Sequence, residues 1–172
     1  MTHDQVIRIV EDSSLRHFLG DFTEYVVPSV RLHARRSSSE DLPMGASRLG
    51  GVPDWADGTP WPTVEDTPMA FIAQINLADL RKFEECSDAT ATGWLCFFYE
   101  ARAQPWGFDP KDRGQWKVVH VQCEHERLRR CQPPSLPEES RFHLCAIDME
   151  VEYQLPHAAI LPGILRREPT DT

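Results

Sequence analysis

The segment SRLGGVPDWADGTPWP, residues 47–62, constrains the fold of this chain more than any other stretch. Its adjacent glycines, Gly50 and Gly51, permit backbone angles that other residues avoid. Its three prolines fix φ and restrict the residue before each of them. We therefore expect a stiff loop outside regular secondary structure. We expect Trp55 and Trp61 to cover a neighbouring sheet, and an exposed aromatic platform is the alternative.

The composition indicates one globular domain over residues 1–172. Of the 172 residues, 41% are hydrophobic and 26% are charged, which is ordinary for a globular chain of one domain that buries a core. The N-terminal segment 1–28 reads as helical, and residues 162–172 read as a flexible tail.

The charge and cysteine content limit the partners and the compartment. A formal net charge of −9 argues against nucleic acid, which requires a basic surface, and favours solubility. No uncharged apolar run approaches the roughly 18 residues that span a bilayer, so we expect no membrane partner. The five cysteines are an odd number in a chain without an export signal. We therefore expect free thiols and a cytoplasmic protein.

The order of the predicted elements indicates an α+β fold. Thr2 and Gln5 resemble a capping box for a first helix, and an apolar stripe between Leu15 and Val26 predicts a second helix that Pro28 ends. The segment 29–42 is polar and basic, which favours an exposed strand end and loop. Residues 77–85 read as a short helix inserted among strands. The predicted strands are PMAFIAQINL (68–77), GWLCFFYE (93–100), WKVVHVQC (116–123) and RFHLCAIDMEVEYQL (141–155). We expect a mostly antiparallel sheet that follows N-terminal helices.

Two side chains near the glycine pair are candidates for binding a small ligand. Arg48 lies beside two amides that could face outward and hold a carboxylate or a phosphate. Gln74 lies in the middle of an apolar strand, where a buried amide needs partners. It could pin the backbone of the glycine loop or contact a ligand. The ligand-binding hypothesis comprises Arg48, Gly50, Gly51, Trp55, Trp61 and Gln74.

A second hypothesis concerns a metal. Cys123 and His125 are two residues apart, as are His143 and Cys145, so each pair shares one face if both segments are strands. Two antiparallel strands could then build a Cys2His2 site that zinc would accept. The close Cys-x-x-Cys spacing of most zinc sites is absent, so we expect no cofactor and keep the four residues as a candidate set.

The sequence shows no complete catalytic constellation. No Gly-x-Ser-x-Gly motif occurs, and Cys96 lies in the most apolar predicted strand, where a thiolate is disfavoured. Acidic residues flanking the tryptophan segment, such as Asp54 and Glu65, could form a carboxylate pair, but loop solvation explains them as well. We therefore name no catalytic residue. The aromatic loop PWGFDPKDRGQW, residues 105–116, is typical of a binding surface, and ordinary turn chemistry is the alternative.

Several of these segments together resemble the YwqG-like family, also called domain of unknown function 1963. The shared elements are Gly-Gly-x-Pro at 50–53, Trp-Pro at 61–62, Phe-Ile-Ala-Gln-Ile-Asn-Leu at 71–77 and Gly-x-Leu-x-Phe-Phe at 93–98. The resemblance covers about residues 30–161. It implies an α+β fold found in bacterial proteins without an established activity, and it supplies no catalytic residue.

One departure from the family pattern concerns the C-terminus. Members of the family usually continue into a second strand-rich half, whereas this sequence ends soon after LPHAAILPG, so the resemblance implies a shortened member. If the absent half normally completes the sheet, one sheet edge is left open. Such an edge could pair with a second copy, which makes a homodimer an expectation.

The features above favour a non-enzymatic function. We expect an acidic cytoplasmic domain that binds another protein with a basic surface, for example an immunity-type protein that neutralises a basic toxin. The alternative is a small-ligand binder or an enzyme that uses the Gly50–Gly51 loop with Arg48 and Gln74. A cavity containing both side chains would favour that alternative.

Overall fold

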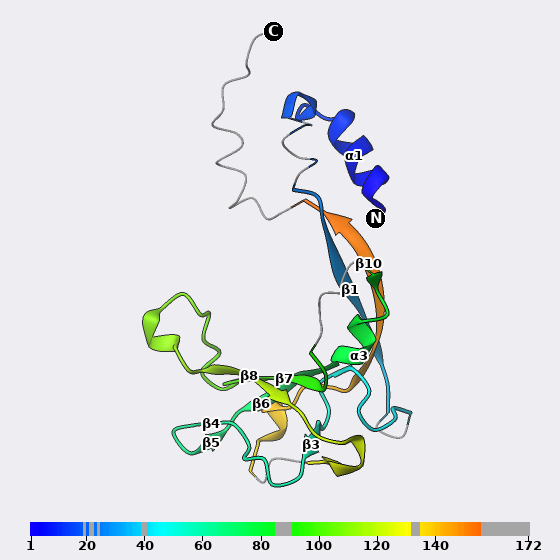
Figure 1. The fold of residues 1–172 in the computed structure, drawn as a ribbon. Coiled ribbons are helices and arrows are strands. Elements are labelled where there is room, and N and C mark those ends of the chain that lie inside the picture. The colour runs from blue at the N-terminus through cyan, green and yellow to red at the C-terminus, as the bar shows by residue number, and fades with distance from the viewer. Residues whose placement is uncertain are drawn as a thin grey trace. The chain divides into compact units, whose positions relative to one another are not determined.

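The computed structural model describes residues 1–18, 20, 23, 25–38, 41–84, 91–131 and 135–155 (Figure 1). The chain divides into two compact units, one formed by residues 1–32 and 149–172 and the other by residues 33–148. None of the helices in these described ranges has both the length and the apolar character needed to cross a bilayer.

The first unit begins with helix α1, His3–Glu11, which has the predicted capping box. The Thr2 hydroxyl accepts a hydrogen bond from the Gln5 amide at 3.3 Å, and the Gln5 side chain accepts one from the Thr2 amide at 2.9 Å. This exchange satisfies two amides that the first helical turn leaves without partners. Val6 and Val10 form the buried side of α1.

One N-terminal helix is described in full, where the sequence predicts two. Arg16–Phe18 forms the 3-10 turn η1. The Ser13 hydroxyl bonds the carbonyl of Val10 and the amide of Leu15, and these bonds to backbone groups end the first helix. Much of the predicted second stripe, including Leu19 and Phe22, lies outside the described residues.

The largest sheet has six strands in the order β1-β10-β2-β6-β7-β8. The strands β1 (Val27–Arg36) and β10 (Cys145–Gln154) each begin in one unit and end in the other. In the first unit, Arg31 Nε donates to Glu152 Oε2 at 2.6 Å. The predicted exposed strand end after residue 29 is therefore a full ten-residue strand.

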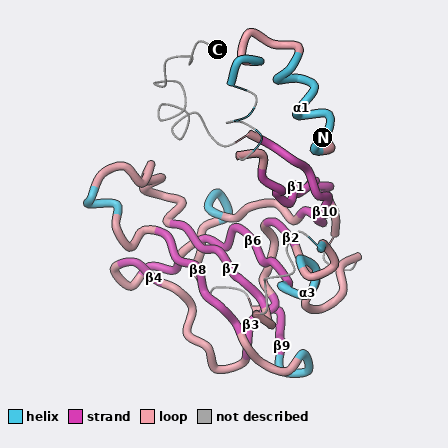
Figure 2. Tube along the Cα trace, turned by 45° about the horizontal axis from the view of Figure 1, so that its top comes forward, coloured by secondary structure: helices cyan, strands magenta, loops and turns pink. Residues whose placement is uncertain are grey.

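Four short strands build most of the second unit's sheet, and Figure 2 shows β6, β7 and β8 side by side. They are β2 (Arg48–Leu49), β6 (Ala70–Asn76), β7 (Trp94–Tyr99) and β8 (Trp116–Val121). Antiparallel pairing joins β10 to β2, β2 to β6, β6 to β7 and β7 to β8, which confirms a mostly antiparallel sheet. The short inserted helix is α3, Leu77–Leu80, where the Asn76 side chain accepts a bond from the Ala78 amide.

Two small sheets and three 3-10 turns are described in full in the second unit besides the six-stranded sheet. The strands β3 (Asp54–Ala56) and β9 (Leu128–Arg130) pair, as do β4 (Thr63–Val64) and β5 (Thr67–Pro68). The turns are η3 (Pro110–Asp112), η4 (His125–Arg127) and η5 (Glu138–Ser140). The segment 47–62 was predicted to lack regular structure, but it contains β2 and β3, whose backbone groups pair with distant strands.

The core lies between one face of the β6–β7–β8 sheet and the β3–β9 pair. Its buried residues are Trp55, Met69, Phe71, Trp94, Cys96, Phe98, Val121 and Leu128. The almost continuous apolar sequence of β7 is typical of a strand covered on both faces. In the structure every second residue of β7 is buried and the others are half-buried, so the two faces are not covered equally.

A β-bulge in β6 decides which side chains reach that core. Phe71 pairs with Phe98, but Ala73 pairs with Phe97, so Ile72 is an extra residue without an opposite partner. Phe71 therefore shares the core face with Gln74, whereas simple alternation would place Phe71 with Ala73 and Ile75.

Candidate functional site

The Gly50–Gly51 turn directs its amides into the protein. Gly50 and Gly51 have φ of +60° and +69°. The Gly50 amide donates to the carbonyl of Ile72 at 2.7 Å, and the Gly51 amide donates to that of Phe142 at 2.8 Å. Both donors are used, so this turn does not present the outward-facing amides that the anion-binding hypothesis requires.

Arg48, on β2, is a buried structural residue with only 1% of its surface exposed. Its Nη2 donates to Asp54 Oδ2 at 2.5 Å, and its other donors reach the carbonyls of Pro43, Ala46 and Val52 at 3.2–3.4 Å. Burial lowers the pKa of Arg48, and the adjacent Asp54 carboxylate opposes that shift. The guanidinium is therefore committed to contacts within the protein.

Asp54 and Gln74 complete the same buried network, and neither is exposed. Besides Arg48, the Asp54 carboxylate accepts bonds from the Gly45 amide at 2.6 Å and from Arg130 Nε at 3.3 Å. The Asp54 amide donates to Gln74 Oε1 at 2.9 Å, and Gln74 Nε2 donates to the carbonyl of Ala46 at 3.1 Å. Gln74 thus pins the loop backbone as predicted, although its partners are Ala46 and Asp54 rather than the two glycines. We refer to the buried side chains of Arg48, Asp54 and Gln74, together with Arg130 at their partly exposed edge, as the buried polar network.

The two tryptophans of the segment lie against the sheet, as the sequence predicted. Trp55 is buried and its Nε1 donates to the carbonyl of Thr59 at 2.8 Å, while Trp61 Nε1 donates to that of Met69 at 3.0 Å. Both rings contact Phe98 edge to face, with centroid distances of 5.3 Å and 5.2 Å. They anchor the loop and are not a free platform.

Cys96, on β7, is a buried thiol beneath this network. Burial raises its pKa to about 12, and the nearby Asp54 carboxylate adds to the shift. The sequence prediction that this thiolate is disfavoured is confirmed, which argues against Cys96 as a nucleophile.

This raised pKa predicts a loss of stability at alkaline pH. An unfolded cysteine loses its proton near pH 8.5, whereas folded Cys96 keeps its proton to about pH 12. Between these values the unfolded state binds fewer protons, so the free energy of unfolding should fall by up to about 1.4 kcal/mol per pH unit. Urea unfolding of the wild type and of Cys96→Ala at several pH values measures this term. The wild type should lose stability more steeply above pH 9, and parallel curves would contradict the assignment.

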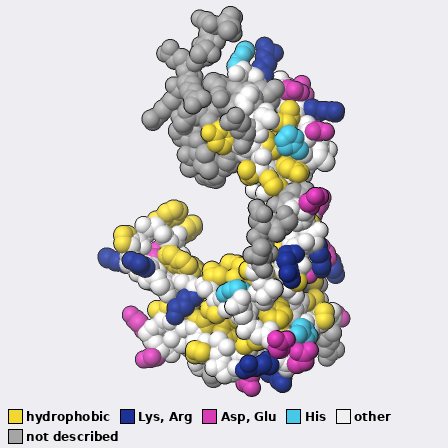
Figure 3. Space-filling view, in the orientation of Figure 1, with side chains coloured by type: hydrophobic (Ala, Val, Ile, Leu, Met, Phe, Trp, Pro, Cys, Tyr) yellow, Lys and Arg dark blue, Asp and Glu magenta, His cyan; other side chains and the backbone are white. Residues whose placement is uncertain are grey.

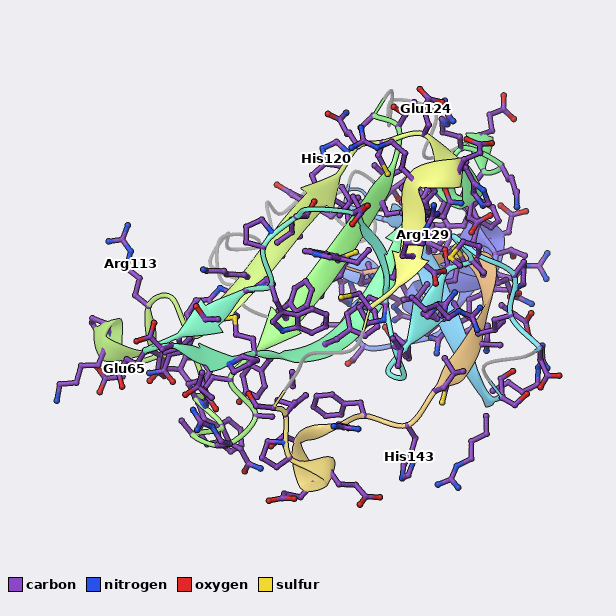
Figure 4. The ribbon with its side chains drawn as sticks, turned by 90° about the horizontal axis from the view of Figure 1, so that it is seen from below. Glu65, Arg113, His120, Glu124, Arg129 and His143 are labelled. Atoms are coloured by element: carbon purple, nitrogen blue, oxygen red, sulfur yellow. The ribbon has the colours of Figure 1, made fainter. Side chains whose placement is uncertain are left out.

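The structure does not bring the four candidate metal ligands together. Cys123 follows the end of β8 and His125 lies in η4, so this pair is not on a strand. His125 Nε2 is 2.9 Å from the carbonyl oxygen of Met44. Figure 4 shows Glu124, between Cys123 and His125, on the opposite side of the view from His143, which precedes β10. In the described part of the chain, no three His, Cys, Asp or Glu side chains are grouped as a metal site.

The β7–β8 loop, residues 100–115, presents the aromatic side chains that are most exposed among the described residues. Trp106 and Phe108 are 86% and 87% exposed. Figure 3 shows hydrophobic side chains beside lysine and arginine side chains on this projecting loop. A groove of about 410 Å³ runs along its base and is lined in part by Tyr99, Trp106 and Phe142. We call Trp106 and Phe108 the aromatic tip.

The loop is held in shape by its own polar groups. At its base, Arg102 forms two side-chain bonds to Glu100, with Nε to Oε1 at 3.0 Å and Nη2 to Oε2 at 2.9 Å. These bonds lower the pKa of Glu100. Near the aromatic tip, the Asp112 carboxylate accepts a bond from the Gly107 amide at 2.9 Å. The tip is thus presented by an ordered loop.

A pocket of about 220 Å³ lies beside Gly51 and was not predicted from the sequence. Its lining is mostly apolar and includes Trp61 and Phe71, together with residues of the segment 136–144. It contains Gly51 and Trp61 of the ligand-binding hypothesis, but neither Arg48 nor Gln74 lines it. Two polar side chains belong to this lining, His143 of the metal hypothesis and Arg141, which no motif in the sequence marked.

The arrangement defines a small α+β domain organised around a glycine-proline segment with a sealed polar network. The chain belongs to the family described as Domain of unknown function (DUF1963), whose pattern matches residues 47–161. The resemblance to domain of unknown function 1963 that the sequence indicates is therefore confirmed. No curated protein sequence matches the chain.

Proposed function

We propose that this chain is a protein-binding module without catalytic activity and that the aromatic tip of the β7–β8 loop contacts its partner. The observation that carries the proposal is the exposure of Trp106 and Phe108, at 86% and 87%. Tryptophan is enriched among the residues that contribute most to protein–protein affinity, and exposed apolar clusters mark interaction sites.

The internal order of the loop supports the same proposal. Its carboxylates bond the loop's own amides and guanidinium groups, so the aromatic side chains are displayed by a preorganised backbone. Binding then requires less loss of conformational entropy than binding by a flexible loop.

The sealed polar network weighs against the alternative of a ligand site built on Arg48 and Gln74. Both side chains have at most 1% exposure, and their polar atoms bond to protein groups. A ligand could reach them only if the core opened.

The net charge of −9 favours a partner with a basic surface, because opposite charges accelerate encounter. The segment 100–117 itself carries four Lys or Arg and three Asp or Glu residues, so this attraction arises from the whole chain rather than from the loop. An immunity-type role against a basic toxin, in the cytoplasm of a bacterial cell, is one case that fits this proposal.

A second copy of this chain is the alternative partner. The strand β8 stands at one end of the sheet order, and its Trp116 and Val118 are 46% and 55% exposed. An exposed sheet edge with apolar side chains can pair with another strand.

Changing Trp106 and Phe108 together to serine is expected to abolish partner binding. The double variant should keep the free energy of unfolding within about 0.5 kcal/mol, because both side chains are exposed. Immobilised wild type and variant are incubated with an extract of the native host. A protein that the wild type retains is then purified, and its affinity for the variant should be weaker by about 100-fold or more.

Matched variants control for the loss of exposed apolar surface elsewhere. Ile9→Ser and Leu32→Ser alter side chains that are 55% and 41% exposed, and they should leave binding unchanged. A dimer in light scattering that the W106S/F108S variant dissociates would identify the second copy as the partner. Equal affinity of the wild type and W106S/F108S for the retained protein would refute the proposal.

A further inference from the structure

The pocket beside Gly51 combines an apolar interior with a single cationic side chain. Apart from Arg141 and His143, its lining residues are Gly51, Val52, Trp61, Phe71, Leu136, Phe142 and Leu144. His143 contributes to the lining, but its side chain points away from the body of the sheet in Figure 4. The chemistry of a bound molecule would therefore be set by apolar walls and by Arg141.

Arg141 is held in place while part of its guanidinium remains available. Its Nε and Nη2 donate to the carbonyl of Leu136 at 3.1 Å and 2.9 Å. A guanidinium has five donor hydrogens, so further hydrogens on its two Nη atoms can still bond an acceptor. Among the described residues, no carboxylate forms a salt bridge with Arg141. The side chain is thus a cation without an anion of its own at the pocket.

We propose that this pocket binds a small monocarboxylate with an apolar body, such as an arylacetate, whose carboxylate pairs with Arg141 and whose ring lies beside Trp61 and Phe71. Arginine binds carboxylates through parallel N–H bonds, and apolar walls favour a ring over a polar body. A single cation matches a monoanion better than a phosphate dianion, which needs several donors.

The volume limits the size of the ligand. About 220 Å³ is the space of roughly seven liquid water molecules, which a single aromatic ring with a short side chain would occupy. Pockets for drug-sized molecules are larger, at about 300–1,000 Å³. The ligand class is therefore one ring or a short branched chain, and affinity should be modest.

Titration with phenylacetate, followed by the backbone amide signals of Gly51 and Val52 and the indole signal of Trp61 in NMR spectra, tests this site. Phenylacetate should shift these signals in a saturable way, and its neutral isostere phenylacetamide should bind at least about 10-fold more weakly. Inorganic phosphate should not compete. Equal affinity for phenylacetate and phenylacetamide, or shifts located mainly outside the pocket, would overturn the proposal.

Substitutions of Arg141 test whether this side chain contributes to ligand binding itself rather than only to folding. Arg141→Gln should lower the affinity for phenylacetate by about 10-fold or more. Arg141→Lys keeps the charge, so it should retain part of the preference for phenylacetate over phenylacetamide. Arg113→Gln, an exposed cation on the β7–β8 loop, is the matched control and should bind normally. The W106S/F108S variant should also bind phenylacetate normally, so failure of this site and failure of the proposed partner surface are distinguishable. Loss of binding in R113Q to the same degree as in R141Q would refute the role of Arg141.

Discussion

Replacing Asp54 with alanine is expected to lower the free energy of unfolding by about 3–5 kcal/mol, since the change leaves the guanidinium of Arg48 buried without its anion. Arg48 and Asp54 are 1% and 0% exposed, so water cannot replace the missing partner. Asp54→Asn keeps the shape but not the charge and should have an effect in the same direction. Urea unfolding followed by tryptophan fluorescence measures it, because all five tryptophans lie in the unit 33–148.

An exposed ion pair of the same unit is the matched control. Arg35 and Asp148 lie 3.3 Å apart with side-chain exposures of 67% and 66%, so Asp148→Ala should cost less than about 1 kcal/mol. Replacing both buried partners, as in Arg48→Met with Asp54→Leu, should recover part of the loss from D54A, because the buried charge of Arg48 is removed as well. Arg130, which also bonds Asp54, is 29% exposed and therefore stays in contact with water. If D54A and D148A destabilise the protein equally, Arg48 does not depend on Asp54 as its counter-ion.

Replacing Gly50 with alanine is expected to destabilise the protein by about 3–5 kcal/mol, for two reasons that act together. Its φ of +60° is unfavourable for alanine, and a Cβ there would lie 2.2 Å from the carbonyl oxygen of His143. That oxygen belongs to the backbone, so a change of rotamer cannot relieve the contact. Thermal or urea unfolding measures the effect.

Gly58→Ala isolates the conformational part of this cost. Gly58 has a φ of +78°, but a Cβ at this position meets no atom within 4 Å. The substitution should therefore cost only about 1–2 kcal/mol. If G50A and G58A lowered the free energy of unfolding equally, the backbone at Phe142 and His143 would be able to move away from the added methyl group. The close packing of this turn would then not contribute to stability.

The sequence correctly predicted the structural elements that depend on residues close together in the chain. The capping box at Thr2 and the cap at Asn76 both form, because each depends on residues two or three positions away. The alternating apolar residues of β6 and the almost continuous apolar run of β7 predicted two strands of a mostly antiparallel sheet, and the structure pairs them. The large apolar area of Trp55 and Trp61 was sufficient to predict that these rings would lie on the sheet.

Features that depend on contacts between residues far apart in the chain could not be predicted from the sequence patterns. Asp54 looked like a solvated loop carboxylate, but the chain reverses after Arg48 and Arg130 approaches from another strand, so Asp54 is buried. The bulge at Ile72 has no sequence signal of its own, yet it moves Gln74 onto the core face. The Arg141 pocket likewise joins segments that are far apart in the chain.

The bond from Arg130 to Asp54 spans 76 positions, and this separation bears on how the protein assembles. Burying the Asp54 carboxylate costs free energy unless a cation contacts it, and Arg130 on β9 supplies one of these contacts. The segment around Asp54 and β9 are therefore more stable together than either is alone. Partly folded states in which only one of the two segments is in place are therefore disfavoured. Bringing residues 76 positions apart together costs conformational entropy, which slows folding. We therefore expect the buried polar network to make these distant segments fold together.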